Sequence, residues 1–578
     1  MIVSMAGEDD DSRYPADGFS SDLQCPNRES SIYANDSQYS CDKFKYNPRG
    51  TGLMFQDLQM PVMLLDDQKE VDSIVSCYRT YNYASGNDSV QEYPLCSVEL
   101  KAFMHGAGNT EVCWRRNSMI RNLSPSSYCQ RLGGLSSYSL LADQSAERII
   151  VVAVRIDSFS LFDREQPGTS SPVAAMATLF ALAEALRPMT ENISAAGYNV
   201  MFVALAGESY DYIGSQRLLF DLDHSRFPSE DKPISMNHID LVIELSQLID
   251  AISDNTIYTH TDPKTSANFP QIARFISLLK SVNSSIDVVS LKDQPLPPSS
   301  SQMFIKAGQN GAPAVVIADY KTEFKTNFYN SYLDTAKAHN MNVSSYDDVS
   351  EQAVFLSRVS SLLAQAIYQF TNADSTALLK ANASTVHHVM YCLLTNPQCD
   401  LFFQVLSPSN IPGLKQANRP FPFYVGVFIS EKSPSNDIQR LTKHMLAYFS
   451  GSPLENVDNS SCINMGGVWM NGPLVNGSRQ NVCYSNRTQY HVALSPAFDI
   501  TGYNFSSGQY STWTESVWDR KAFHIKLFLR PSLEVELACM VAGISLFIAS
   551  AIFIVYIHRR ADVLFPAIIP SLDSTEPL

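Results

Sequence analysis

An uncharged apolar run near the C-terminus, Leu537–Ile557, determines on which side of a membrane the rest of the chain can fold. It has 21 residues, enough to cross the roughly 30 Å hydrocarbon core of a bilayer as a helix. Glu534 and Glu536 precede the run, and the basic stretch His558–Arg560 follows it. Because basic flanks stay in the cytoplasm, the large N-terminal part should lie outside the cell or in a lumen. The sequence therefore predicts a single-pass type I membrane protein.

Composition indicates an ordered and acidic protein. The 578 residues are 45% apolar and 17% charged, which is typical of a folded chain with two or more domains. The net charge is −16, and no basic face is evident. This composition excludes nucleic acid as a partner, since phosphate binding needs clustered lysine and arginine.

Cysteines are placed as in an exported protein. Ten of the eleven precede the apolar run, and Cys539 lies within it. An even number of exported cysteines favours disulfides, and closely spaced cysteines are the simplest partners. These pairs are Cys25–Cys41, Cys77–Cys96, Cys113–Cys129, Cys392–Cys399 and Cys462–Cys483. Spacing alone leaves the connectivity open.

Eleven N-x-S/T sequons precede the apolar run and favour N-glycosylation. The asparagines are Asn35, Asn87, Asn122, Asn192, Asn283, Asn342, Asn382, Asn459, Asn476, Asn486 and Asn504. The first residues, Met1–Asp11, lack the basic and apolar regions of a signal peptide. Either the chain is a truncated form or the apolar run itself acts as the targeting signal, and we favour truncation.

Short apolar runs alternate with helical patterns from about residue 148 onward. Ile149–Val154 and Val200–Ala206 have the continuous apolar character of strands buried on both faces. Between them Val173–Leu186 is a predicted helix, with Ser171 as its N-cap. Further strands are predicted at Leu241–Leu245 and Ala314–Ile317, and helices at Ser215–Leu222, Phe275–Val282 and Val354–Phe370. The alternation predicts an α/β fold with a doubly wound mixed sheet.

We expect four segments along the chain. Residues 1–145 are rich in turns and cysteine and should form a small disulfide-rich lobe. The large α/β lobe is expected at 146–530, the transmembrane helix at 531–558 and a short cytoplasmic tail at 559–578.

The segment Asn199–Ser215 places Glu208 at the carboxyl end of a predicted strand, where open α/β sheets bind ligands. It resembles the active-site segment of the zinc aminopeptidases of the transferrin-receptor superfamily, which reads approximately G-E-E-x-G-L-x-G-S. In those enzymes the first Glu is the general base and the second binds metal. Ser209 stands in the second position here, and a serine hydroxyl is a poor zinc ligand.

The same resemblance implies four more ligand positions. The His of an H-x-D-S motif is Arg155, two residues before Asp157, and the bridging Asp falls in the acid-free segment Pro167–Pro172. The next Asp is Glu244, and the last His is Asn330. Arginine does not deprotonate to bind metal, so at most one of the five positions keeps a ligand. We therefore expect a pseudo-peptidase without metal or other cofactor.

Three carboxylates should remain in this pocket, namely Asp157, Glu208 and Glu244. Without a metal they would repel one another. We expect Arg155 to supply the missing positive charge by pairing with one or two of them through its planar guanidinium group.

Other stretches widen the resemblance to nearly the whole chain. They are Asp211–Ser215 (DYIGS), Gln294–Ser300 (QPLPPSS), Leu494–Phe498 (LSPAF), Tyr510–Ser516 (YSTWTES) and Ala561–Phe565 (ADVLF). With these segments the chain resembles the nicastrin family, the large glycosylated subunits of the γ-secretase intramembrane protease. The resemblance implies an aminopeptidase-like large lobe, no catalytic role, and assembly with presenilin, anterior-pharynx-defective and presenilin-enhancer subunits. It also implies contact with membrane lipid, gating of shed type I membrane-protein stubs, and residence in the endoplasmic reticulum, Golgi, plasma membrane and endosomes.

Site roles follow from the same resemblance. Glu208 and Tyr212 match residues proposed to meet the free N-terminus of a substrate, and Asp211, Asp157 and Arg155 adjoin them. Tyr46 stands where the family has a lid tryptophan. Glu208 could instead only maintain the fold, and a purely steric gate is the other alternative.

Two rival functions stay open. One is a stand-alone receptor on an inactive peptidase fold, and the other is an active zinc aminopeptidase, which the substituted ligand positions oppose. Small residues in the apolar run would allow neighbouring helices to approach closely, as in a membrane complex. They are Ala538, Ala542, Gly543, Ser545, Ala549, Ser550 and Ala551.

Overall fold

Two compact units interleave along the chain. The computed structural model describes residues 2–4, 14–65, 67–83, 90–106, 108–119, 127–142, 146–162, 168–228, 233–282, 285–307, 311–371, 377–485, 487–519 and 521–565. The smaller unit combines Met1–Glu8, Leu58–Phe103 and Trp518–Leu578, and the larger combines Asp9–Asp57 and Met104–Val517. This division differs from the contiguous segments 1–145 and 146–530 expected from the sequence, because parts of the first segment pack within the larger unit.

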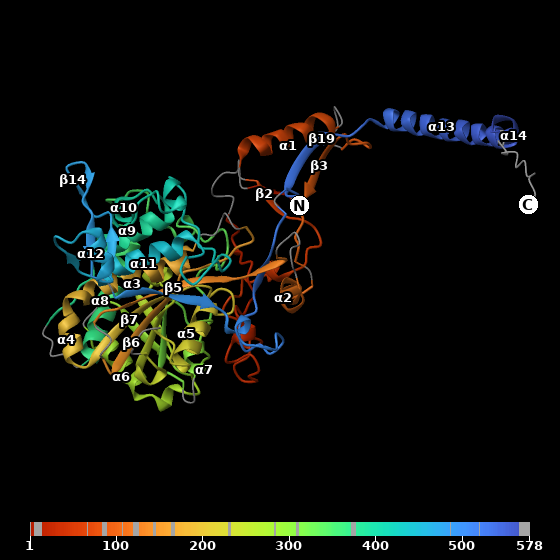
Figure 1. Ribbon diagram of the computed structural model, residues 1–578. Helices are drawn as coiled ribbons and strands as arrows, with labels where there is room; N and C mark the ends of the chain where they lie inside the picture. The colour runs from red at the N-terminus through yellow and green to blue at the C-terminus, as the bar shows by residue number, and fades with distance from the viewer. Residues whose placement is uncertain are drawn as a thin grey trace, which may run out of the picture. The chain divides into compact units, whose positions relative to one another are not determined.

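An eight-stranded mixed sheet forms the centre of the larger unit (Figure 1). In sheet order its strands are β10 (Asp287–Leu291), β9 (Thr256–His260), β11 (Ala314–Ala318), β8 (Ile239–Leu245), β6 (Arg148–Arg155), β7 (Tyr198–Leu205), β5 (Gly133–Leu140) and β17 (Thr488–Leu494). Neighbours from β11 through β8 and β6 to β7 are parallel, whereas β9 and β5 run antiparallel to them. The predicted α/β class with a doubly wound mixed sheet is confirmed.

Alternate residues of the central strands enter different cores. In β6, Ile150 and Val152 pack in one hydrophobic cluster, while Val151 and Ala153 pack in the other. The first cluster is covered by α3 (Ala174–Leu186), α4 (Thr190–Ala195), α6 (Pro270–Ser281), α8 (Glu351–Phe370), α9 (Ala383–Leu394), α10 (Asp400–Val405) and α11 (Asp437–Ser450), and the second by α5 (Ile213–Asp223) and α7 (Ser301–Lys306). Because helices cover both faces, the strands are apolar on both sides.

Helix α3 explains why one long apolar stretch is not a membrane span. The segment Thr169–Ala195 is apolar enough to cross a bilayer, but 94% of its most apolar window is buried. The helix lies against α8, α9 and α11. It follows a π-helical turn, Thr169–Val173, in which Ser171 is extended, and its N-cap residue is Val173, so the N-cap predicted at Ser171 is wrong.

The smaller unit contains short strands and the C-terminal apolar helix. Strand β3 (Cys96–Lys101) pairs antiparallel with β19 (His524–Leu529). Also in this unit are β1 (Ile2–Ser4), β2 (Met63–Leu65), α1 (Gln68–Tyr81) and α14 (Ala561–Leu564). Helix α13 (Leu533–Arg559) has 27 residues, and its most apolar window, with mean hydropathy 2.5, has no buried residue. It is long and apolar enough to cross a membrane.

Small elements complete the larger unit. They are α2 (Thr110–Met119), α12 (Asn459–Asn464), the pair β4 (Cys129–Arg131) and β18 (Thr514–Ser516), the pair β14 (Leu474–Val475) and β15 (Ser478–Arg479), and the sheet of β12 (Pro453–Leu454), β16 (Val482–Tyr484) and β13 (Val468–Met470). Disulfides join the five cysteine pairs suggested by the sequence.

Seven sequon asparagines lie in the described part of the chain, and all seven are exposed. They are Asn35, Asn192, Asn342, Asn382, Asn459, Asn476 and Asn504. Asn87, Asn122, Asn283 and Asn486 lie outside the described residues.

Candidate functional site

The candidate site lies at the carboxyl ends of three adjacent parallel strands, β6, β7 and β8. Arg155 ends β6 and is followed by Asp157, Glu208 comes just after β7, and Glu244 is near the end of β8. Topology therefore brings together residues that are far apart in the sequence. Arg155, Glu208 and Glu244 border a cavity of about 20 Å³, room for about one water molecule.

Asp157 is held by the turn after β7. Its carboxylate accepts hydrogen bonds from the backbone N–H groups of Gly207, Glu208 and Ser209, at 2.7, 2.9 and 2.8 Å. Burial raises the pKa of Asp157, although the positive charge of Arg155 and these donors oppose the shift. The carboxylate thus fixes the backbone that carries Glu208.

Glu208 is only 2% exposed, and its carboxylate accepts hydrogen bonds from two serines. One oxygen accepts from the Ser215 backbone N–H at 2.8 Å, and the other accepts from the hydroxyls of Ser215 and Ser300, at 2.8 and 2.5 Å. Burial raises the pKa of Glu208 to about 8, despite these donors, and the nearby Asp157 charge adds to the rise. At neutral pH the side chain is therefore mostly a neutral acid.

The carboxylate of Glu244 is hydrogen-bonded to backbone amides at the start of helix α7. Its two oxygens accept from the backbone N–H groups of Ser300 and Ser301, at 3.0 and 2.7 Å. Burial raises the pKa of Glu244 as well. Ser300 therefore links the two glutamates, since its hydroxyl binds Glu208 and its amide binds Glu244.

The expected ion pair between Arg155 and the carboxylates is not formed. Arg155 donates from Nη1 to the Tyr329 hydroxyl at 2.7 Å, and from Nη2 to Asn330 Oδ1 at 3.0 Å. The reason is that Asp157 already turns toward the Gly207–Ser209 amides. Arg155 acts on Asp157 only through longer-range attraction.

These residues do not fit a zinc site. Two of the five expected ligand positions, Arg155 and Asn330, bond to each other, and Ser209 donates its hydroxyl to the Asp157 carbonyl at 3.1 Å. Across the described ranges, no group of three or more His, Cys, Asp or Glu side chains is arranged to hold a metal ion. Pro167, at the start of the acid-free segment, lies outside those ranges. An arginine, an amide and a hydroxyl cannot replace imidazole and carboxylate ligands.

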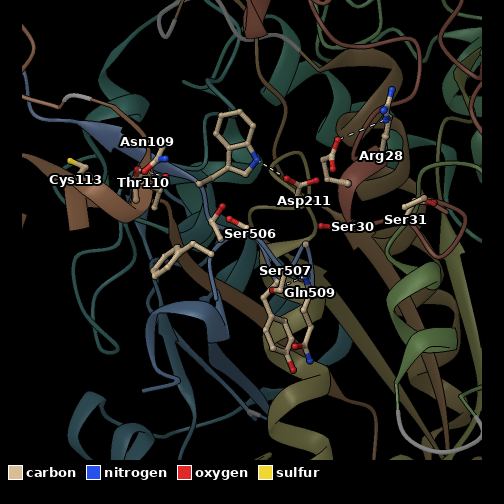
Figure 2. A pocket seen from close by; sticks show the side chains of 18 of the residues that line it. Arg28, Ser30, Ser31, Asn109, Thr110, Cys113, Asp211, Ser506, Ser507 and Gln509 are labelled. Atoms are coloured by element: carbon tan, nitrogen blue, oxygen red, sulfur yellow. Dashed lines mark hydrogen bonds and ion pairs between the residues drawn. The ribbon is translucent and has the colours of Figure 1, made fainter. Parts of the chain in front are cut away.

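Asp211 and Tyr212 point in different directions although they are adjacent. Both have left-handed backbone angles, with φ of 58°. Tyr212 is 2% exposed and borders the small cavity beside Glu208. Asp211 instead accepts from the Trp513 indole at 2.8 Å and lines a separate, large cleft, as Figure 2 shows. The sequence grouped these two residues in one site, and the structure separates them.

The predicted lid residue is buried in the larger unit. Tyr46 is 4% exposed, and its hydroxyl donates to the Pro295 carbonyl at 2.5 Å. Its ring packs against Tyr320 and Phe324.

Asn27 is a site residue that sequence reasoning missed. Its amide donates to the Glu208 carbonyl at 2.7 Å and accepts from the Asp211 N–H at 3.0 Å. It thereby fastens the N-terminal segment to the loop after β7. A single asparagine among turn residues carries no signal of such a distant contact, and Ser300 was missed for the same reason.

Fold and site together define an α/β protein with a C-terminal helix long and apolar enough to span a membrane, and with a buried cluster of carboxylates at the carboxyl ends of its central strands. The model of the nicastrin large lobe matches residues 148–368, and that of the nicastrin small lobe matches residues 2–106. Nicastrin of Homo sapiens is 32% identical over 96% of this chain and 80% of its own length. Nicastrin of Arabidopsis thaliana is 25% identical over 91% of this chain and 77% of its own length. A crystal structure of the γ-secretase component nicastrin has the same fold, with a TM-score of 0.66 at 22% identity over 92% of this chain and 86% of that chain. The chain belongs to the nicastrin family.

Proposed function

We propose that this chain is a non-catalytic, glycosylated type I membrane subunit of a γ-secretase complex. Membership of the nicastrin family supports this role, since a solved member is a γ-secretase component. Helix α13 would anchor the chain and contact presenilin, anterior-pharynx-defective and presenilin-enhancer subunits. The complex would pass through the endoplasmic reticulum and Golgi to the plasma membrane and endosomes.

We propose further that the ectodomain admits shed membrane-protein stubs by steric exclusion. Steric exclusion is supported by the hydrogen bonds that Glu208 makes within the chain. Both of its oxygens are bonded within the chain, and the cavity beside it holds about one water molecule. A peptide N-terminus would have to displace Ser215 or Ser300 to reach the carboxylate. Glu208 therefore maintains the fold of the pocket.

The test is a mild-detergent purification of the tagged full-length chain from cells that lack their own family member. Mass spectrometry should recover a presenilin-like aspartyl protease and the two small membrane subunits in equal amounts. Recovery of the chain alone, or as a homodimer, would contradict the subunit role and favour a stand-alone receptor.

The proposal of steric exclusion is tested separately in the same cells. Glu208→Gln should assemble normally and still allow cleavage of a stub with a short ectodomain, while a long-ectodomain substrate stays excluded. Normal assembly with lost cleavage of the stub would mean that Glu208 binds substrate.

A further inference from the structure

A large cleft lies within the larger unit, and the proposed function does not use it. Its volume is about 1530 Å³, above the roughly 300–1,000 Å³ of most small-molecule pockets. One wall is the segment Arg28–Asp36, another is Phe505–Ser516, and a third carries the start of α2. Figure 2 shows side chains from all three walls around the space.

The lining suits a neutral, hydroxyl-rich ligand. Amides and hydroxyls from Asn109, Thr110, Ser506, Ser507 and Gln509 face the cleft, and such groups both donate and accept hydrogen bonds. The aromatic rings of Phe505, Tyr510 and Trp513 also line it. Rings next to hydroxyl and amide groups match the alternating apolar and polar faces of sugar rings.

Acidic side chains outnumber basic ones at the cleft, so an anionic ligand is disfavoured. Glu29, Asp36, Asp57 and Asp211 line it together with Arg28 and Lys306. Asp36 forms an ion pair with Lys264, and Arg28 lies 3.8 Å from Glu29. Asp211 accepts from the Trp513 indole. With Asp36 paired to Lys264, the remaining charge of the lining is small and negative, which suits a neutral ligand better than an anion.

Two glycosylation sequons belong to the walls of this cleft. Asn35 is exposed and is itself a lining residue. Asn504 is exposed, and the next two residues of its sequon, Phe505 and Ser506, line the facing segment. A glycan attached at either asparagine would start at the rim of a space that suits sugar chemically.

We propose that the cleft binds the chain's own N-linked oligosaccharide, attached at Asn35, with a second glycan at Asn504 closing its rim. This inference rests on the exported topology in the proposed function, but it does not depend on γ-secretase assembly. The bound sugar would fill the cleft and make it inaccessible to other ligands.

The first test uses the full-length protein with oligomannose glycans and follows release by an endoglycosidase. Glycopeptide mass spectrometry should find Asn35 and Asn504 occupied. Under native conditions their glycans should be released at least tenfold more slowly than the glycan of Asn342, which lies outside the cleft, and all three at equal rates after denaturation. Vacant sites at Asn35 and Asn504, or equal native rates, would overturn the proposal.

A second test identifies the occupant. In a Gln509→Cys background, labelling by a membrane-impermeant maleimide should be slow and should accelerate at least fivefold when Asn35→Gln and Asn504→Gln are added. Ser37→Ala with Ser506→Ala removes the same sequons and should reproduce the effect, whereas Asn342→Gln should not. Slow labelling that persists without both glycans would mean that a different ligand or a partner's sugar fills the cleft, and would overturn the assignment.

Discussion

Arg155 and Asn330 are hydrogen-bonded to each other, with Nη2 and Oδ1 3.0 Å apart. From the resemblance to zinc aminopeptidases we expect these two positions to match metal-binding histidines. Asn330 also donates from its amide to Asp22 at 2.9 Å, so a line of polar contacts runs from the end of β6 to the N-terminal segment. These two residues therefore link the end of β6 to the N-terminal segment.

Arg155→Ala should destabilise the protein by about 3 kcal/mol, because buried polar partners would lose their donor and Asp157 its nearest cation. Arg155→Lys should recover part of this loss. Thermal unfolding of the detergent-solubilised chain measures both variants. An alanine variant as stable as the parent would show that the arginine network is dispensable.

Glu208 should make stability fall as pH rises. Its pKa is raised from 4.5 to about 8 by burial, so between these values the folded state holds a proton that the unfolded state has lost. The contribution of Glu208 to the free energy of unfolding is fully present below about pH 4.5. It declines by at most about 5 kcal/mol as the pH rises to about 8. In Glu208→Gln this decline should be smaller when unfolding is followed from pH 4.5 to 8. Parallel curves for the two proteins would contradict the buried neutral acid.

His339 should contribute in a different pH window. Its ring nitrogens lie 3.1 Å from Asp250 and 2.8 Å from Asp334. Burial alone would lower the pKa, but these two carboxylates outweigh it and raise the pKa to about 10. The stabilisation is complete below about 6.5 and is lost as pH rises through about 10. His339→Gln should therefore lower the free energy of unfolding most at pH 6 and least at pH 10.5. Denaturant unfolding measures this difference. A loss of stability that does not depend on pH would argue against a charged imidazole.

Gly214→Ala should be destabilising because the new Cβ would lie 2.5 Å from the Ala206 carbonyl oxygen and 2.9 Å from Glu208 Oε1. Helix α5 must then move away from β7, at a cost of about 1–3 kcal/mol. Gly543→Ala in the isolated detergent-solubilised chain is the matched control, since nothing within the chain lies within 4 Å of its Cβ. Equal melting temperatures for the two variants would refute the close approach.

The small residues of α13 predict a helix–helix contact. Replacing both Gly543 and Ala549 with leucine should reduce co-purification of the other membrane subunits several-fold, because larger side chains keep helices apart. Ile548→Leu, which conserves volume in the same helix, should leave recovery unchanged. Full recovery of the subunits with the double variant would place the contact elsewhere.

The sequence predicts the four central strands β6, β7, β8 and β11 because their signals are local, whereas β5, β9, β10 and β17 were not predicted. Apolar runs such as Val200–Ala206 mark strands buried on both faces, and the rule that ligands meet the carboxyl ends of strands places Asp157 and Glu208 together. The partners of these acids are less predictable. Ser300 and Asn27 act through single hydrogen bonds across long stretches of chain, and no period or motif encodes such contacts.

The pairing of β3 with β19 has a consequence for biosynthesis. Strand β3 is synthesised first, and its partner β19, which directly precedes helix α13, follows only after the segment Met104–Val517 of the larger unit. Until then β3 presents an open edge that chaperones must shield from aggregation. Closure of the smaller unit therefore requires a chain that extends through β19, so a chain that ends before His524 would leave β3 unpaired.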